Sequence, residues 1–171
     1  MKHIEAKAME LLESAGCDFI PVDLSLIAEK LNIPIHETEF TDDVSGALIR
    51  EGDETVIAIN TSEPLKRKRF TIAHELGHFY LKHAGTLFID QKVFNRRDGR
   101  SELAVDRQEI EANAFAAALL MPAHRVMDAA ISSLEKTPHL DQVGLATLLA
   151  AKFNVSEQAM GFRLTNLGLG Y

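Results

Sequence analysis

The sequence predicts an α+β protein in which one small β-sheet lies among several helices. Between residues 33 and 60, short segments rich in β-branched residues alternate apolar and polar positions, which is typical of strands. Before and after that stretch, apolar positions recur at helical spacing. The chain has 171 residues, of which 46% are hydrophobic and 25% charged, so it can bury one substantial core and has an ordinary globular composition.

Two packing helices are predicted ahead of the strands. Residues 3–15 carry apolar positions at helical spacing, and Gly16 follows as a stop signal. Asp23 is placed to cap a second, short helix over 24–31, which ends before Pro34.

A small sheet is expected next, followed by a helix and a loop. The predicted strands are 33–40, 44–50 and 55–60. The turn residues 51–54 join the last two into a hairpin. After the helix, residues 85–100 predict a loop or a short strand pair that begins around 86–89. A polar loop between two buried helices is well placed to rim an active site.

The helix after the strands contains the sequence His74-Glu75-Leu76-Gly77-His78. Residues four apart lie on one face of a helix, so His74 and His78 can offer two imidazoles to one metal ion. Glu75 projects beside that pair, where it is placed for a general base. Imidazole and carboxylate groups bind zinc while leaving a position open for water, so the motif predicts metal-assisted hydrolysis.

The alternative interpretation is a solvated helix with two histidines and a glutamate on its surface. Apolar residues cover most of the circumference of this helix, which indicates that it is buried. A buried motif of this kind without a ligand would leave polar groups unpaired, so the metal site is favoured. Thr61 or Ser62 is the expected N-cap, and Ala84-Gly85 is expected to end the helix after His83.

The next helix is predicted to start at about Ser101 or Asp106 and to end at Leu120, before Met121-Pro122. From residue 112 onward it is apolar on every side, and its small alanines allow another backbone to approach closely. Glu109 and Glu111 lie just before that apolar run. A carboxylate carried into a core needs a partner, and a metal ion is such a partner.

The last part of the chain predicts further helices. A helical stripe at 126–134 is followed by two shorter helices, 145–153 and 157–167, with Ser156 as the N-cap of the second. This pair resembles a helix-turn-helix, but its second helix carries only one arginine, Arg163, which favours packing over DNA recognition. We therefore expect a domain over 1–125 and a C-terminal helical extension, 126–171, packed on the same domain.

Charge and composition exclude several classes of protein. A net charge of −7 argues against general nucleic-acid binding, and the basic run 66–69 is expected to be a solvated face. Cys17 is the single cysteine, which excludes an intramolecular disulfide and a thiolate cluster. No apolar run approaches the roughly 20 residues of a spanning helix, and the charged start differs from a signal peptide. A cytoplasmic protein without membrane partners is expected.

The motifs together resemble the ImmA/IrrE family of metallopeptidases. The resemblance runs through Val22-Asp23, Ile27-Ala28, Ser45-Gly46, 69–78 and 109–122. It implies a zincin-like α+β fold, in which a small twisted sheet packs on the active-site helix, and a zinc cofactor, with manganese or iron as alternatives. It also implies cleavage of a helix-turn-helix transcriptional repressor, of phage, mobile-element or stress-response type.

Two glutamates compete for the role of third metal ligand. In gluzincin-type sites this ligand is a Glu on a second helix, and a polar residue one turn later often supports a liganding histidine. Glu109 followed by Asn113 fits that layout, and Glu111 is the alternative. If the helix began at Asp106, Glu109 would instead belong to a capping box, whereas a start near Ser101 removes that role.

The predicted mechanism uses Glu75 to take a proton from the attacking water and to pass it to the departing amine. His83, Tyr80, His124 and Arg125 are candidates either to assist the oxyanion or to be structural. A free sheet edge is expected to pair with an extended peptide of a protein substrate. The competing hypotheses are a non-catalytic metal-containing module that binds a repressor or DNA, and a metal hydrolase acting on small molecules.

Overall fold

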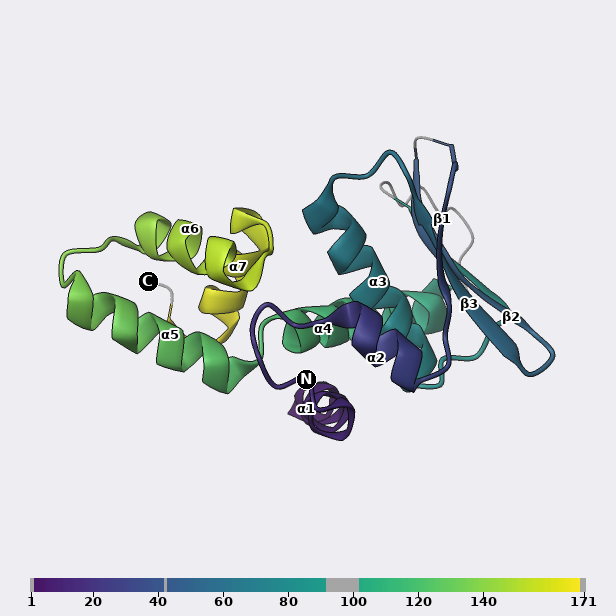
Figure 1. Ribbon diagram of the computed structural model, residues 1–171, viewed down its shortest axis with the longest axis horizontal. Coiled ribbons are helices and arrows are strands. Elements are labelled where there is room, and N and C mark those ends of the chain that lie inside the picture. The colour runs from purple at the N-terminus through teal and green to yellow at the C-terminus, as the bar shows by residue number, and fades with distance from the viewer. Residues whose placement is uncertain (1, 42, 92–101, 170–171) are drawn as a thin grey trace.

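The predicted α+β class is confirmed by the computed structural model, which describes residues 2–41, 43–91 and 102–169 (Figure 1). In chain order its elements are α1 (Lys2–Ala15), α2 (Leu24–Lys30), β1 (Ile35–Thr38), β2 (Val44–Glu51), β3 (Glu54–Asn60), α3 (Leu65–Tyr80), β4 (Leu87–Gln91), α4 (Glu102–Leu120), α5 (Ala123–Lys136), α6 (Gln142–Phe153) and α7 (Glu157–Asn166). The predicted N-cap residues of α2 and α7 are confirmed. Asp23 accepts hydrogen bonds from the backbone N–H groups of Ser25 and Leu26, and Ser156 accepts one from Ala159.

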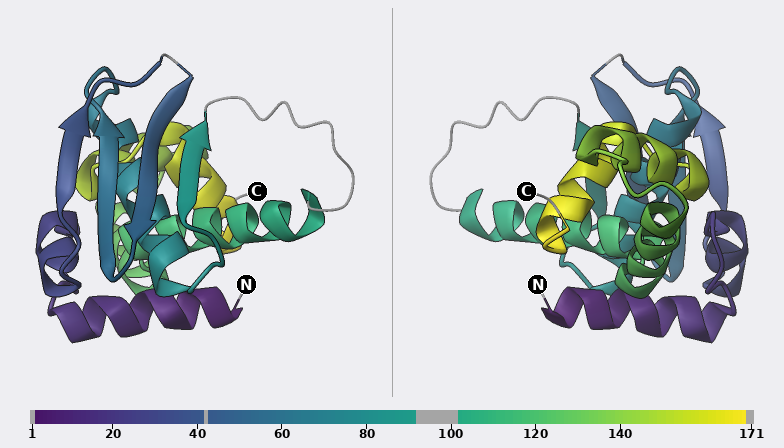
Figure 2. Two further views of the ribbon diagram at one scale, coloured as in Figure 1. Left: turned by 90° about the vertical axis from the view of Figure 1, so that its right-hand side faces the viewer. Right: turned by 90° about the vertical axis from the view of Figure 1, so that its left-hand side faces the viewer.

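The four described strands form one sheet in the order β1-β3-β2-β4. β1 runs parallel to β3, whereas β2 is antiparallel to both β3 and β4. In this register Leu48 of β2 lies opposite Ile57 on one side and Phe88 on the other. These side chains are buried and belong to the main hydrophobic core. Figure 2 shows the strands side by side across one side of the molecule, with α3 and α4 behind them.

α3 lies at the centre of the fold, in contact with α4 on one side and with β2 and β3 on the other. Gly46 of β2 permits the close approach of sheet and helix, because a Cβ atom there would lie 2.6 Å from the Thr71 Cγ2 atom of α3. α1 packs along α4 and closes the far side of the core. The His-Glu-x-x-His motif is thus carried by a helix that lies between the sheet and α4.

The start and end of α3 differ from the prediction. Pro64, rather than Thr61 or Ser62, precedes the helix, and no side chain of the described residues caps it. The reason is competition from Asn60, whose side-chain oxygen accepts both the N–H and the hydroxyl of Ser62. The helix also ends earlier than Ala84-Gly85, because Lys82 adopts a left-handed conformation with φ of 56°.

The stretch 85–100 contains a strand rather than only a loop. β4 pairs with the edge of β2, and the remaining residues, 92–100, lie outside the described part of the chain. α4 begins at Glu102, which removes the capping-box role considered for Glu109.

α5, α6 and α7 form a lobe beside the end of α4 (Figure 1). Arg163 of α7 ties this lobe to the rest of the chain, because its guanidinium donates to the Met121 carbonyl oxygen and pairs with the Glu5 carboxylate of α1. The predicted boundary at residue 125 falls inside α5, and the division into a domain and an extension stays a prediction. The apolar stripe predicted on α5 is buried in part. Val126 and Ala130 belong to the core, whereas Met127 and Ile131 are 45% and 55% exposed.

Within the part of the chain that the structure describes, no single helix is long and apolar enough to cross a membrane. Two helical segments, 107–120 and 123–136, which are bent by 49° relative to each other, are together long and apolar enough to cross a membrane by length and composition only.

Candidate metal centre

α3 and α4 bring three of the predicted site residues together. The ligand atoms of His74, His78 and Glu109 all lie within 4.8 Å of one another. The Nε2 atoms of the two histidines are 3.0 Å apart, and they lie 3.2 and 3.5 Å from the two Glu109 carboxylate oxygens. The side chains are 4%, 0% and 12% exposed, so the cluster faces the interior of the protein.

A glycine within the motif makes this convergence possible. A Cβ atom at Gly77 would lie 3.2 Å from the Phe115 Cδ1 atom and 3.3 Å from the Ala112 Cα atom of α4. A methyl group there would require the neighbouring atoms to shift by a few tenths of an ångström, so glycine lets the α4 backbone come close to α3. Ala112 supplies the small residue on the opposite helix, as the alanine-rich run predicts. The close approach brings Glu109 within reach of both histidines.

The charge state of the cluster fits a divalent cation. Burial raises the pKa of Glu109, but the adjacent imidazoles of His74 and His78 outweigh it and hold the pKa at about 2. Burial also lowers the pKa of His78, which favours neutral imidazole. One oxygen of Glu109 is buried without a hydrogen-bond donor in the described part of the chain. An ionised carboxylate and imidazole lone pairs that converge on one point are the donor set of zinc and similar ions.

Each histidine of the cluster has a partner on its outward ring nitrogen. For His74 the Nδ1 atom lies 3.2 Å from the Asn113 side-chain oxygen, which is the support predicted from the spacing of Glu109 and Asn113. A histidine that presents its Nε2 lone pair to a metal carries its proton on Nδ1. The Asn113 side-chain oxygen therefore accepts a hydrogen bond from the His74 Nδ1–H group, and the Asn113 NH₂ group does not contact His74.

The partner of His78 is His83, and their Nδ1 atoms lie 3.0 Å apart. The opposite nitrogen of His83, Nε2, lies 3.3 Å from a Glu111 carboxylate oxygen. Glu111, the alternative third ligand, is thus placed behind a histidine rather than at the cluster, and Arg107 donates to its other oxygen at 2.9 Å. The three side chains form a line from Glu111 through His83 to His78.

Glu75 lies beside the cluster, and the charge of Arg67 offsets only part of the rise that burial causes in its pKa. Its side chain is 0% exposed, and neither oxygen has a hydrogen-bond donor among the described residues. Burial is the largest cause that raises the pKa of Glu75 well above its ordinary value, and the carboxylates of Asp90 and Glu109 raise it further. A buried carboxylate in this state is available to exchange a proton with a group brought into the site.

The comparison with protein families decides the assignment. A peptidase family model described as the IrrE N-terminal-like domain matches residues 28–165, which is well over half of the chain. The chain belongs to this IrrE-like family. The resemblance inferred from the motifs is therefore confirmed, and the sheet beside α3 and α4 is consistent with the zincin-like fold of an ImmA/IrrE-type metallopeptidase. No curated protein matches the chain in sequence.

In this IrrE-like chain the basic run 66–69 mainly holds the fold together. Arg67 donates to both Asp90 carboxylate oxygens, at 2.8 and 2.7 Å, and to the Ser45 hydroxyl at 3.1 Å. Lys68 pairs with Glu37 of β1. Arg69 donates to the Asn154 carbonyl oxygen ahead of α7, and to that of Val22. The predicted solvated face is therefore wrong for these three residues, whereas Lys66 is exposed.

Sequence reasoning missed the role of Arg50 on β2. Its guanidinium donates to the His83 and His78 carbonyl oxygens at 2.6 and 3.1 Å, so the sheet holds the end of the motif helix. Asp90 was also missed as the residue that positions Arg67 and accepts from the Thr71 hydroxyl at 2.8 Å. Both residues lie far along the chain from their partners, and no local pattern marks them.

The four oxyanion candidates have other partners in this IrrE-like fold. His83 supports His78, and Tyr80 packs on Phe115 with ring centroids 5.7 Å apart. His124 and Arg125 both contact the Asp18 carboxylate, at 3.1 and 2.8 Å. Their geometry agrees with the structural alternative in each case.

Proposed function

We propose that the chain is a zinc-dependent endopeptidase that cleaves a helix-turn-helix transcriptional repressor. The observation that carries the catalytic part is Glu75, a buried carboxylate without a hydrogen-bond donor among the described residues, which lies on α3 with His74 and His78. Burying such a group costs free energy, and a metal site that served only to stabilise the fold would not need it. A general base in a hydrolase does need it.

His74, His78 and Glu109 would hold the metal, with Asn113 and His83 orienting the two imidazoles. The bound cation would supply a Lewis acid for the scissile carbonyl and lower the pKa of a water in the site. Glu75 takes the proton of the attacking water and hands it to the departing amine. The pKa of Glu75 is raised by burial, which suits a group that must both accept and return a proton near neutral pH.

Backbone recognition is assigned to the outer edge of β4. This strand ends the order β1-β3-β2-β4, so one side of its backbone faces away from the sheet among the described residues. Phe88 of β4 packs on the His78 ring with centroids 4.3 Å apart, which puts that edge next to the cluster. An extended peptide added there would bind largely through main-chain hydrogen bonds.

A repressor as the substrate rests on the ImmA/IrrE resemblance and on the charge of the chain. A net charge of −7 does not favour DNA as the direct partner. Arg163, the arginine of the helix-turn-helix-like pair, is buried and pairs with Glu5, so phosphate contacts would require breaking that pair. Docking of a folded partner is then expected to supply much of the selectivity.

The test is incubation of the zinc-reconstituted protein with the repressor encoded beside its gene, with Glu75→Gln as the control. We expect one cut that abolishes operator binding or dimerisation of the repressor, and little cleavage of casein. Glu75→Gln should keep the metal and bind the repressor without cutting it. If Glu75→Gln releases the repressor from DNA as well as the parent does, the non-catalytic regulator replaces the peptidase as the better hypothesis.

A further inference from the structure

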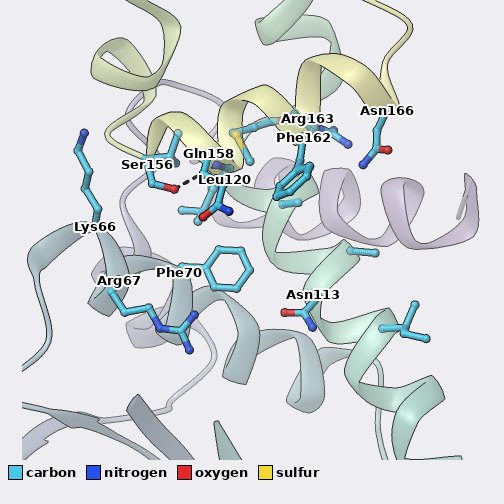
Figure 3. A pocket seen from close by; sticks show the side chains of 16 residues that line it. Lys66, Arg67, Phe70, Asn113, Leu120, Ser156, Gln158, Phe162, Arg163 and Asn166 are labelled. Atoms are coloured by element: carbon cyan, nitrogen blue, oxygen red, sulfur yellow. Dashed lines mark hydrogen bonds between the residues drawn. The ribbon is translucent and has the colours of Figure 1, made fainter. Parts of the chain in front are cut away.

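An apolar groove of about 600 Å³ opens between α3, α4 and α7, beside the candidate metal centre. Phe70 of α3, Ala117 of α4 and Phe162 of α7 line it, and Leu120 lines it as well. In Figure 3 the rings of Phe70 and Phe162 both point toward the space beside Asn113. Three helices that are distant in sequence therefore build one concave apolar surface.

The groove continues the helix faces that carry the metal-centre residues. Phe70 precedes His74 by four residues on α3, and Ala117 follows Asn113 by four on α4. Residues four apart lie on the same face of a helix. One face of α3 and one face of α4 therefore extend from the cluster into the groove. Asn113 belongs to both, since it lines the groove and contacts His74 at 3.2 Å. A chain bound at the cluster would extend directly into the groove.

The polar groups at the ends of the groove suit a peptide with an acidic residue. Because the Asn113 oxygen accepts from His74, its NH₂ group is free to donate to a peptide carbonyl. Lys66 and Arg67 line the other end, and Lys66 presents an exposed ammonium group in a chain of net charge −7. Arg67 already binds Asp90 and Arg163 pairs with Glu5, so among the described residues of the groove Lys66 is the cation that a ligand carboxylate would meet.

Two large apolar side chains at this groove are open to solvent. Phe162 is 64% exposed and Ile110, the neighbour of Glu109, is 61% exposed. Apolar side chains that flank a concave apolar surface mark a site for an apolar ligand group. We propose that the groove binds the substrate segment next to the scissile bond, with a large aliphatic or aromatic side chain in the apolar space and an acidic residue facing Lys66. This inference rests on the proposed peptidase function.

The test uses the zinc-reconstituted Glu75→Gln protein, which should bind peptides without cutting them, and a displayed library of random peptides. Selected peptides should share a Leu, Ile, Met or Phe with an Asp or Glu nearby. Phe162→Asp should weaken their binding by about tenfold or more, because a charge replaces an apolar wall. Ile131→Asp places the same charge at an exposed apolar position on α5, outside the groove, and should bind them as the parent does.

Two further measurements locate the bound peptide. Lys66→Glu should weaken binding, whereas Lys152→Glu, an exposed lysine on α6 that does not line the groove, should not. With methyl-labelled methionine, peptide binding should shift the NMR signal of Met121, which lines the groove, and leave that of Met127 unchanged. Equal binding by Phe162→Asp and the parent, or the absence of any enriched peptide, would overturn the proposal.

The failure of this inference is distinguishable from the failure of the peptidase proposal. If the parent cleaves a repressor and Phe162→Asp cleaves it equally well, the groove is not the substrate site and the peptidase function stands. If peptides bind in the groove and no repressor is cut, the binding site stands and the peptidase function does not.

Discussion

The Nδ1 atom of His83 lies 3.0 Å from the Nδ1 atom of His78, so a hydrogen bond between the rings requires a proton on one of these two nitrogens. If His78 presents Nε2 to a metal, its Nδ1–H group donates to His83, whose Nε2–H group then donates to the Glu111 carboxylate. The backbone places His83 for this role. Lys82 is left-handed, and the N–H of His83 returns to the His78 carbonyl oxygen at 3.1 Å.

His83→Ala should weaken zinc binding by about 10- to 100-fold, because the orientation and tautomer of His78 lose their support. Competition with a chromophoric zinc chelator measures the affinity. The matched control is His139→Ala, an exposed histidine between α5 and α6, which should bind zinc as the parent does. Equal affinities in all three proteins would remove the assigned role of His83.

The part of the site that follows helical periodicity could be predicted from the sequence. The spacing of His74 and His78 fixes their common face, and the pairing of Glu109 with Asn113 indicated which carboxylate lies near them. Neither inference requires knowledge of a distant contact. The assignment of these residues as metal ligands remains a prediction, although the geometry brings them within 4.8 Å.

Contacts between distant segments could not be predicted in the same way. Arg50 reaches the end of α3 from a strand, and Asp90 meets Arg67 across 23 positions of sequence. The predicted N-cap of α3 was wrong for a related reason. Ser62 donates to the Asn60 side chain instead of capping the helix, and the local sequence does not indicate which of these two roles Ser62 takes. Such contacts depend on how the sheet and the helix are placed, which local periodicity does not specify.

Removal of the metal should lower the thermal stability of the chain. A ligand that binds only the folded state at about 100 times its Kd contributes about 2.7 kcal/mol, which corresponds to a shift of several degrees in Tm. Thermal unfolding with and without a chelator measures the shift. His78→Ala should unfold at one temperature in both conditions, whereas a chelator effect that persists in His78→Ala would argue for a metal held elsewhere.

Asp18 should stabilise the fold in a pH-dependent way. Arg125 is the main cause that lowers the pKa of Asp18 from its ordinary value of 3.8, first through its hydrogen bond and then through its charge. A lowered folded-state pKa gives stability that is present above pH 3.8 and is lost as the pH falls through the folded value. Both side chains are 38% exposed, so the effect should be only about 0.5–1 kcal/mol.

Urea unfolding of Asp18→Asn against the parent checks this expectation. The difference in unfolding free energy should be present at neutral pH and should shrink below pH 3.8. Asp53→Asn, in the exposed turn between β2 and β3, changes the charge equally and should show no such difference. A difference for Asp18→Asn that stays constant with pH would indicate a contribution other than the ion pair.

Gly77→Val should both destabilise the fold and weaken metal binding. Even a single Cβ atom at this position would lie 3.3 Å from the Ala112 Cα atom, and backbone cannot give way as a flexible side chain can. The added branches would push α4 away from α3, so Glu109 would move from His74 and His78. Overpacking of this kind costs about 1–3 kcal/mol, which chemical denaturation can measure.

Gly161→Val is the control for the intrinsic effect of replacing glycine in a helix. Gly161 lies in α7, and a Cβ atom there meets nothing within 4 Å in the described structure. This variant should be neutral or more stable, because valine favours a helix over glycine by a few tenths of a kcal/mol. Zinc content per chain should fall only in Gly77→Val. If Gly77→Val retains both its stability and its zinc, close contact between α3 and α4 is not what assembles the metal centre.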